Sequence, residues 1–268
     1  MSYTSTNRIL SSDFINLCQS LTTLAKSFYG LIGYPLTHSF SPGYFNQKFR
    51  EEGLDAIYTS YPLPDISLLP ALLKEHPQLR GLNVTIPYKT AVLPYLDEMN
   101  MDVQQMGAAN CIRIEEGKLI GYNSDWTAFR DSLQPLLRPE HTQALILGNG
   151  GAAKAVAYAL RQMGIAYRIV SRGRDSNTLS YERVTPALLQ DHLLLINTTP
   201  LGMFPEEDSA PEIPYEALTS RHLLYDLIYN PAATLFLKKG AAQDAITKNG
   251  LEMLHLQAEG SWRIWMGA

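Results

Sequence analysis

The sequence predicts an α/β protein with two domains, each built on a mainly parallel sheet. From Phe28 onward, short apolar runs alternate with longer amphipathic ones, which is the pattern of consecutive βα units. A second such series begins at Ala144, after Pro135 and Pro139 have ended the preceding helix, and it opens with a cluster of glycines. The 268 residues are enough for one large domain or for two of ordinary size.

The individual elements follow from the spacing of apolar residues and from the turn residues between them. A strand is predicted wherever a short apolar or alternating run lies between turn-forming residues. These runs are Phe28–Gly33, Ala56–Pro62, Gly81–Ile86, Ala144–Gly148, Tyr167–Ser171, Leu193–Asn197 and Leu223–Leu227. Two further alternating runs, Cys111–Glu115 and Lys118–Tyr122, flank a Glu-Gly turn and predict a hairpin. Helices are predicted near 42–53, 66–75, 87–97, 125–137, 151–163, 232–241 and 250–266.

The domain boundaries are placed between these series. Residues 1–27 are expected to be an amino-terminal extension, which lacks the charged start and the cleavage site of a secretory signal. Residues 28–123 form the first predicted domain, and 124–249 form the second. The last helix carries Leu251, Trp262 and Trp265 and is too apolar to remain in solvent. We therefore expect residues 250–268 to return to the first domain and complete it.

Composition narrows the possible functions. Hydrophobic residues make up 46% of the chain and charged residues 18%, which is typical of a globular protein. No apolar run approaches the roughly 18 residues of a membrane-spanning helix, so a cytoplasmic protein without a membrane partner is expected. A net charge of −4 argues against nucleic acid as a partner. Cys18 and Cys111 lack metal-ligand spacing, so no metal site is expected.

A strand, a glycine turn and a helix follow one another from Ala144 to Arg161. This is the G-x-G-x-x-G/A arrangement of dinucleotide-binding proteins, in the context that it requires. Gly148 permits the tight turn, Gly150 lets a pyrophosphate approach the backbone, and N–H groups of the helix start face the phosphates. A purely structural turn is the alternative. The residues predicted to bind the cofactor here are Gly148, Asn149, Gly150, Gly151 and Ala152.

The end of the next strand indicates which dinucleotide binds. An acidic residue there bonds the ribose 2′-hydroxyl of NAD, whereas a cation selects the 2′-phosphate of NADP. This strand ends in Ser171 and Arg172, and Arg174 follows two residues later. Guanidinium groups form directed, charge-assisted hydrogen bonds with phosphate, so the sequence favours NADP(H). Asp175 could approach the ribose after a small loop shift, and ordinary loop charge is the alternative for the arginines.

Polar groups also gather in the segment Gly81–Lys89. Side chains alternate along a strand, so Asn83 and Thr85 share one face, opposite the apolar face that packs. Pro87 ends the strand, which leaves Lys89 just beyond its carboxyl end, where open α/β sheets bind ligands. The alternatives are polar residues of an edge strand and a solvated lysine.

Several ordered motifs between about residues 28 and 266 resemble those of the shikimate dehydrogenase family. The glycine turn and the segment Gly81–Lys89 are two of them. The others are Gly33–Pro42, Ala108–Asn110, Tyr122–Asp125, Ile196–Met203, Tyr225–Pro231 and Gly250–Ala258. Two departures stand out. Trp126 takes the place of the family's usual glycine, and Ser171-Arg172-Gly173 replaces the usual N-R-T.

The resemblance implies reversible, NADPH-dependent reduction of 3-dehydroshikimate to shikimate, a step of aromatic amino acid biosynthesis through chorismate. It also implies a substrate-binding domain, a Rossmann-type NADP-binding domain and an active site in the cleft between them. Lys89 would carry the proton, and Asp125 would orient Lys89 and a substrate hydroxyl. The residues expected to bind the substrate are Ser39, Ser41, Asn83, Thr85, Asn110, Tyr229 and Gln257. Thr198, Thr199, Met203 and Gly250 join the cofactor site.

Other interpretations of single residues stay open at this point. Ser39 and Ser41 could cap a helix, Asp125 suits a helix start, Tyr229 could be a core aromatic, and Met203 could fill a gap in the core. His38 fits helix entry or packing better than acid–base chemistry. The sequence allows a monomer or a homodimer. Three rival functions are a quinate/shikimate dehydrogenase that uses NAD, a non-catalytic NADP-binding protein on the same scaffold, and a folate-linked dehydrogenase.

Overall fold

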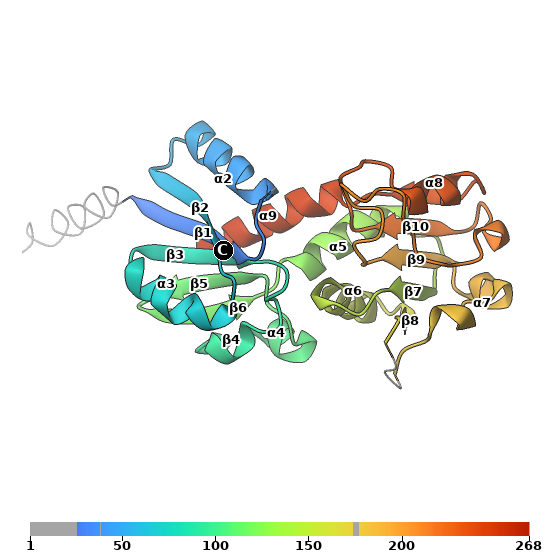
Figure 1. Ribbon diagram of the computed structural model, residues 1–268, viewed down its shortest axis with the longest axis horizontal. Helices are drawn as coiled ribbons and strands as arrows, with labels where there is room; N and C mark the ends of the chain where they lie inside the picture. Colours follow the sequence, from blue (N-terminus) through green and yellow to red (C-terminus); the bar gives the residue numbers. More distant parts are fainter. Residues whose placement is uncertain (1–25, 38, 174–176, 268) are drawn as a thin grey trace, which may run out of the picture.

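The computed structural model describes residues 26–37, 39–173 and 177–267. Two lobes lie side by side, each with a sheet at its centre, and the helices α5 (Asp125–Leu133) and α9 (Leu251–Trp265) run between them (Figure 1). We call the lobe that contains the sheet of residues 27–122 the first half and the other lobe the second half. The predicted α/β class with two sheets rich in parallel strands is confirmed.

The sheet of the first half has six strands in the order β2-β1-β3-β5-β6-β4. Their bounds are β1 Ser27–Gly33, β2 Ala56–Pro62, β3 Leu79–Val84, β4 Glu98–Met99, β5 Cys111–Glu115 and β6 Lys118–Tyr122. β1 pairs in parallel with β2 and β3, whereas β5 is antiparallel to both β3 and β6. The predicted hairpin has the expected bounds, with Cys111 opposite Tyr122 and Glu115 opposite Lys118.

Side-chain alternation divides the core of the first half between the two faces of its sheet. Leu82 and Val84 of β3 pack on one face, against the 3-10 turn Ile66–Leu68 and α3 (Leu69–Glu75). The opposite face is covered by α2 (Phe40–Glu51) and α9, with a core that includes Phe45 and Trp265. Asn83 therefore points toward the α2–α9 layer. A Cβ on the neighbouring Gly81 would lie 2.3 Å from Nε1 of Trp265, so only glycine lets α9 lie this close to β3.

The sheet of the second half has five parallel strands in the order β11-β10-β9-β7-β8. Their bounds are β7 Gln143–Leu147, β8 Ala166–Val170, β9 Leu194–Asn197, β10 Leu223–Asp226 and β11 Ile246–Lys248. α5 and α6 (Gly151–Gln162) pack on one face, and α7 (Pro186–Asp191) and α8 (Leu235–Ala241) pack on the other. The chain reverses its direction across the sheet between β7 and β9, so their carboxyl ends form the crevice where such sheets bind ligands.

The helix predicted at 87–97 is wrong. β3 ends at Val84, and turns follow up to a short 3-10 helix at Leu93–Tyr95. One α-type hydrogen bond forms, from the Val92 N–H to the Tyr88 carbonyl. Pro94 has no N–H to donate, so an α-helical hydrogen-bond ladder cannot continue through it. Four short strands and α-helices were not predicted. These are β4, β11, α7 and α4 (Met101–Met106), which is capped by Asn100 and ends at Gly107.

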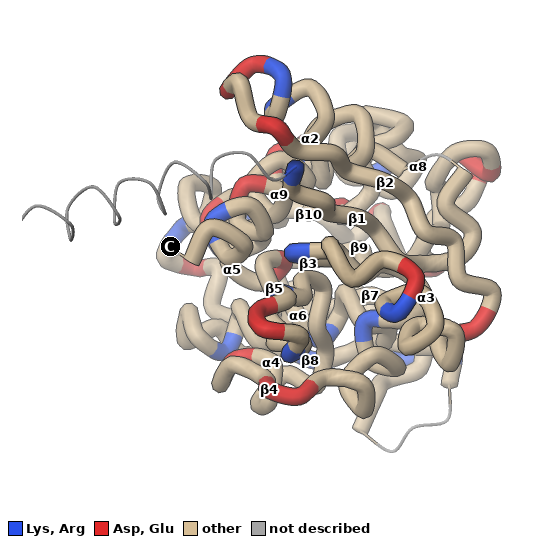
Figure 2. The backbone as a smooth tube through the Cα atoms, turned by 90° about the vertical axis from the view of Figure 1, so that its left-hand side faces the viewer, with Lys and Arg blue, Asp and Glu red and all other residues tan. Residues whose placement is uncertain are grey.

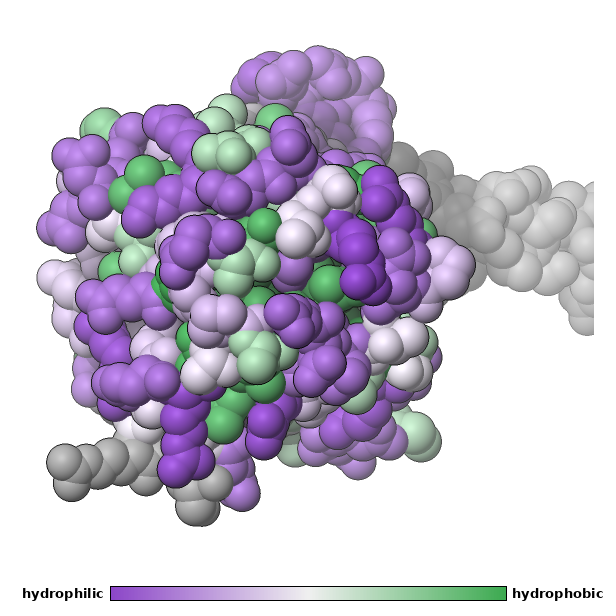
Figure 3. Space-filling view, turned by 90° about the vertical axis from the view of Figure 1, so that its right-hand side faces the viewer, coloured by the Kyte–Doolittle hydropathy of each residue, from purple (hydrophilic) through white to green (hydrophobic). Residues whose placement is uncertain are grey.

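The surfaces at the two ends of the molecule are mixed in character. Seen from the first half, Lys and Arg positions are interspersed with Asp and Glu (Figure 2). Seen from the second half, polar residues predominate, and the hydrophobic areas are small and scattered (Figure 3). No helix among the described residues is long and apolar enough to cross a bilayer.

Candidate active site

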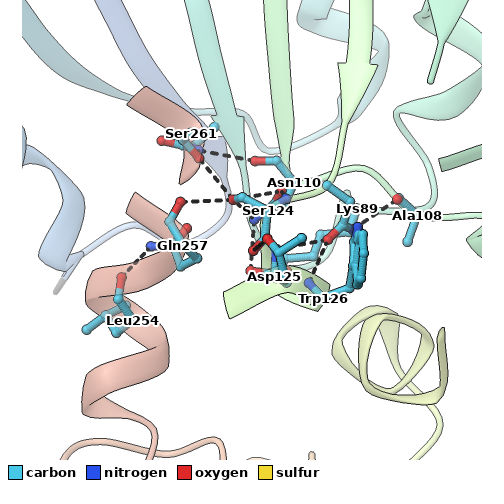
Figure 4. A network of polar contacts seen from close by, with 12 residues as sticks. Lys89, Ala108, Asn110, Ser124, Asp125, Trp126, Leu254, Gln257 and Ser261 are labelled. Atoms are coloured by element: carbon cyan, nitrogen blue, oxygen red, sulfur yellow. Dashed lines mark hydrogen bonds and ion pairs between the residues drawn. The ribbon is translucent and has the colours of Figure 1, made fainter. Parts of the chain in front are cut away.

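Lys89 and Asp125 form an ion pair where the two halves meet. The Lys89 ammonium donates to Oδ2 of Asp125 over 2.7 Å, and the two side chains are only 17% and 8% exposed (Figure 4). Lys89 lies in the turns that follow β3, and Asp125 is the first residue of α5. Because neither group is free in solvent, the pair has a defined geometry and not that of a fluctuating surface contact.

Asn110 holds the second oxygen of the Asp125 carboxylate. Its Nδ2 donates to Oδ1 of Asp125 over 2.8 Å, and the Asp125 N–H donates to Oδ1 of Asn123 over 3.0 Å. The start of α5 also favours a negative charge at this place. Ser124, not Asp125, occupies the N-cap position, and no side-chain capping bond forms there. The carboxylate is therefore directed at Lys89 and Asn110 and does not serve as a helix cap.

A chain of hydroxyl groups joins this pair to α9. The Ser124 hydroxyl donates to the backbone oxygen of Gln257 over 2.9 Å and lies 3.1 Å from the Ser261 hydroxyl. Oδ1 of Asn110 accepts the Ser124 N–H over 2.7 Å. The amide nitrogen of the Gln257 side chain donates to the Leu254 carbonyl over 2.9 Å. No described residue donates to the amide oxygen of Gln257. α9 thus fixes one side of the site and presents Gln257 there (Figure 4).

Asn83 does not take the position expected of a substrate contact. It is 5% exposed, and its Nδ2 donates to Ser261 Oγ over 2.7 Å and to the Asn110 carbonyl over 3.3 Å. Its Oδ1 accepts the Tyr58 hydroxyl over 2.8 Å. Both amide protons have partners inside the protein, so Asn83 supports Asn110 and α9 and does not face a ligand.

Ser39 and Thr85 carry hydroxyl groups with little internal bonding. Ser39 is the N-cap residue of α2 but makes no capping bond, and its Oγ lies 3.5 Å from the Leu36 carbonyl. No hydrogen bond links the Thr85 hydroxyl to another described residue. A Cβ on Gly33 would lie 2.4 Å from Thr85 Cγ2, so glycine lets the end of β1 lie this close to Thr85.

Ser41 is bonded to a buried tyrosine. Burial raises the pKa of the Tyr58 hydroxyl, and a hydrogen bond from Ser41 opposes that rise. Tyr58 therefore remains protonated and donates to Asn83, as described above. Ser41 lies in the first turn of α2 and links the start of that helix to the Asn83 network.

The glycine turn of the second half lies directly beside Lys89. Gly148 has a φ of +113°, and a Cβ there would lie 2.6 Å from Thr198 Oγ1, so both conformation and space require glycine. A Cβ on Gly150 would meet nothing within 4 Å, which leaves open space above the turn. A Cβ on Gly151 would lie 3.2 Å from Cβ of Lys89. The predicted cofactor turn and the predicted proton carrier are therefore neighbours.

Known proteins share this arrangement. The model of the shikimate dehydrogenase substrate binding domain matches residues 31–112. The shikimate dehydrogenase (NADP(+)) of Carboxydothermus hydrogenoformans is 38% identical over 89% of this chain and 91% of its own. That of Methanocaldococcus jannaschii is also 38% identical, over 89% of this chain and 90% of its own. This chain belongs to the shikimate dehydrogenase family.

Solved structures agree with this assignment. The shikimate 5-dehydrogenase of Thermus thermophilus, in complex with NADP(H) and shikimate, is 31% identical with a TM-score of 0.80, covering 90% of this chain and 94% of its own. A 5-ketofructose reductase of Gluconobacter sp. strain CHM43 is 30% identical with a TM-score of 0.78, covering 91% and 94%. The scaffold of the family therefore also occurs in a reductase named for a different ketone.

The family's second cofactor segment follows β9. Both threonine hydroxyls bond within the protein, Thr198 to the Leu147 carbonyl over 2.8 Å and Thr199 to Oδ1 of Asn197 over 2.6 Å. They shape the loop, which leaves its backbone to meet a ligand. Met203 is 46% exposed, so it does not fill a gap in the core.

Two further motif residues lie where β10 meets α9. Gly250 precedes α9, and a Cβ there would lie 2.1 Å from the Leu227 carbonyl oxygen, so two backbones pass each other in close contact. Tyr229 is half-buried in the segment after β10 and is not a member of the hydrophobic clusters found among the described residues. It is therefore not a core aromatic.

The residues expected to select the 2′-phosphate lie after β8. The Ser171 hydroxyl is 3.0 Å from that of Thr178, and Ser171 is 9% exposed. Arg172 is exposed, and its charge lowers the pKa of Tyr181 against the stronger raising effect of burial. Arg174, Asp175 and His38 lie outside the described residues.

Sequence reasoning overlooked a buried carboxylate, Asp226, although its motif was recognised. Its Oδ1 accepts from Asn197 Nδ2 and from the Ile228 N–H, each over 3.0 Å, and its Oδ2 accepts the Thr234 hydroxyl over 2.6 Å. Burial raises its pKa from 3.8 to about 6, although these bonds lower it. Asp226 ties together the ends of β9 and β10 and the start of α8.

The described residues contain no set of side chains arranged as metal ligands. No group of three or more His, Cys, Asp or Glu side chains there is arranged to hold a metal ion. Cys111 is fully buried in β5, and burial raises the pKa of its thiol to about 12. Cys111 is therefore a protonated core residue beside Ser261 and Trp265.

Proposed function

We propose that this protein is an NADP-dependent shikimate dehydrogenase, which reversibly reduces 3-dehydroshikimate to shikimate. The observation that carries the proposal is the Lys89–Asp125 pair, held at 2.7 Å directly beside the glycine turn. A ketone reductase needs a proton donor next to its hydride source, and this is where the two meet. The names of the relatives support the choice of substrate and cofactor.

The second half fits a dinucleotide. Gly148–Ala152 form a turn at a helix start, with open space above Gly150 and N–H groups free for phosphate. Ser171 and Arg172 would hold the 2′-phosphate, and Arg174 would join them. Met203 and Gly250 would border the nicotinamide end. When bound, NADPH supplies the hydride.

Lys89 holds the proton that the ketone oxygen needs. An ammonium group has three N–H donors, and Asp125 takes one of them over 2.7 Å. The remaining donors can stabilise the charge that develops on the ketone oxygen and deliver the proton. Asp125 keeps the ammonium in place because Asn110 and the start of α5 fix its own orientation.

The first half offers neutral donors for a substrate carboxylate. Ser39 and Thr85 have hydroxyl groups without strong internal partners, and Ser41 lies on the same helix start as Ser39. The free amide oxygen of Gln257 can accept from a ring hydroxyl. Tyr229 completes the set, whereas both amide protons of Asn110 are taken by Asp125 and Ser124, so Asn110 acts through Asp125. Neutral donors select a substrate by geometry, which suits a small acid with several hydroxyls.

One assay tests the proposal. The full chain is mixed with 3-dehydroshikimate and either NADPH or NADH, and the loss of nicotinamide absorbance is followed. We expect consumption of NADPH, with a higher kcat/KM than for NADH. Consumption of neither cofactor refutes the proposal and favours a binding protein. In the reverse direction, a preference for quinate and NAD over shikimate and NADP assigns the rival dehydrogenase.

The division into domains is part of the proposal. A substrate-binding domain of residues 28–123, completed by 250–268, would carry Lys89 and the carboxylate site, and a Rossmann-type NADP-binding domain would span 124–249. Residues 1–27 would form an extension. We propose that the enzyme acts in the cytoplasm on small molecules, as a monomer or homodimer, without nucleic acid or membrane partners.

A further inference from the structure

We propose that Trp126 is a positioning residue, which lies on α5, packs between α4 and α6 and thereby fixes the glycine turn against Lys89. The inference rests on the proposed function, because it concerns the distance between hydride source and proton carrier. It starts from the residue at which this chain departs from the glycine usual in its family.

The Trp126 ring lies in a hydrophobic cluster shared by both halves. Its centroid is 5.2 Å from that of Tyr158, at an interplanar angle of 77°, which is the edge-to-face arrangement that aromatic rings prefer. The same cluster includes Met106 and Ala108 of the first half and Ala155 of α6. Arg130 covers the ring with its guanidinium carbon 5.1 Å from the centroid. Trp126 thus fills the space between the two halves.

One face of α6 makes the contacts between this helix and the first half. Gly151, Lys154, Ala155 and Tyr158 are spaced three, four and seven residues apart, so they form a single stripe along the helix. Lys154 donates to the Gly107 carbonyl over 3.1 Å, and the Tyr158 hydroxyl donates to Asp102 over 2.6 Å. The stripe begins at Gly151, where an added Cβ would meet Lys89, and ends at Tyr158, which packs against Trp126.

This geometry connects Trp126 to the chemistry. Asp125 precedes it directly, so the indole anchors the carboxylate that holds Lys89. Through Tyr158 the same indole anchors the helix that presents the glycine turn. A glycine at position 126 would leave a void between Tyr158 and Met106 and would let α6 tilt about its remaining contacts. A displacement of about 1 Å in a reacting geometry can lower a rate roughly 100-fold.

The test is steady-state kinetics of Trp126→Gly and Trp126→Phe in the full chain. For Trp126→Gly we expect kcat to fall about tenfold or more, with KM for 3-dehydroshikimate within about threefold, because the carboxylate site is untouched. Trp126→Phe retains a ring against Tyr158 and should recover most of the rate. Deuterated NADPH should give a larger isotope effect on kcat in Trp126→Gly, because hydride transfer becomes slower.

The matched control is Tyr215→Gly. Tyr215 also packs edge-to-face on a second ring, Phe236, and lies under a cation, Lys239, but all three belong to the second half. A cavity there should leave the kcat nearly unchanged. An equal loss of kcat in both variants, or a kcat within twofold of wild type in Trp126→Gly, overturns the inference.

A readout without substrate or cofactor complements the kinetics. Amide hydrogen exchange should become about tenfold faster in the first two turns of α6 in Trp126→Gly and remain unchanged in α8. If amide hydrogen exchange in α6 is unchanged in Trp126→Gly, the positioning role of Trp126 is contradicted even if kcat falls. Absence of turnover by the wild type refutes the proposed function, whereas an active wild type with an unaffected Trp126→Gly refutes only the positioning role.

Discussion

On the first-half side of the active site and at the start of α5, Lys89 is held by buried side chains that are bonded to one another, whereas the second half offers a turn of glycines and backbone. Asp125, Asn110 and Asn83 are each at most 6% exposed. Asn110 donates to Asp125 over 2.8 Å, and Asn83 donates to the Asn110 carbonyl over 3.3 Å. Gly150 has open space beside its backbone, and neither Gly148 nor Gly150 has a side chain to adjust. A proton must be placed to a fraction of an ångström, while a large cofactor needs room to enter.

The largest expected effect comes from removing the proton carrier. Lys89→Ala should lower kcat about 1000-fold, because the ketone oxygen loses its acid and the charge near it. The matched control is Lys118→Ala, since Lys118 also pairs with a carboxylate, Glu98, at 3.0 Å but lies at the surface. NADPH oxidation measures both. Equal activity of the two variants contradicts the role of Lys89.

Asp226 allows the same comparison to be tested in the second half, because it lies at the centre of a buried hydrogen-bond network there. Its pKa in the folded protein, about 6, lies above the ordinary 3.8, so the folded state takes up the proton first. Stability from this group is present below pH 3.8 and is lost as the pH rises through about 6. The expected loss is about 3 kcal/mol of unfolding free energy relative to Asp226→Asn.

Chemical denaturation of the wild type and of Asp226→Asn at a series of pH values measures this difference. The difference should change between the two pKa values and stay constant above pH 6. If the difference in unfolding free energy does not depend on pH, folding does not raise the pKa of the Asp226 carboxyl group.

Asn83→Ala distinguishes a structural role of Asn83 from direct contact with the substrate. The change leaves Tyr58 and Ser261 without their partner in a buried place, which should cost about 2 kcal/mol of unfolding free energy. The KM for 3-dehydroshikimate should stay within about threefold of wild type, since Asn83 does not face the substrate. Denaturation and kinetics on the same sample decide. A large rise in KM with unchanged stability would instead support the direct contact between Asn83 and the substrate that the sequence predicts.

Ser39→Ala should give the smallest effect. Loss of one donor to the substrate carboxylate should raise KM about tenfold, which corresponds to roughly 1.4 kcal/mol. Stability should not change, because Ser39 makes no capping bond. A drop in thermal stability at unchanged KM would instead identify Ser39 as the cap of α2.

Much of this arrangement is encoded locally, and the sequence predicted those parts. The hairpin 111–122 was placed correctly because Glu116 and Gly117, both with positive φ, form its turn. The glycine turn was recognisable because strand, turn and helix are consecutive. The prediction of a helix at 87–97 was wrong because the apolar spacing suggested a helix, whereas Pro94 interrupts its hydrogen-bond ladder. α4 was missed although Asn100 and Gly107 mark its ends.

The supporting contacts could not be predicted because they join distant segments. Ser261 lies in α9 beyond the end of the motif Gly250–Ala258, yet it bonds Asn83, which is 178 residues away. Tyr158 finds Asp102 across 56 residues. Trp126 was noticed only as a departure from a family pattern, and its partners follow from how α6 lies on α4. Such pairs depend on tertiary packing and leave no signal in local sequence.

The central claim is that proton chemistry belongs to the first half and cofactor binding to the second. The dissociation constant of NADPH for Lys89→Ala tests it most directly. Alanine retains the Cβ that lies beside Gly151, so the constant should stay within about twofold of wild type while turnover is lost. An NADPH affinity that falls in proportion to the lost turnover contradicts the claim.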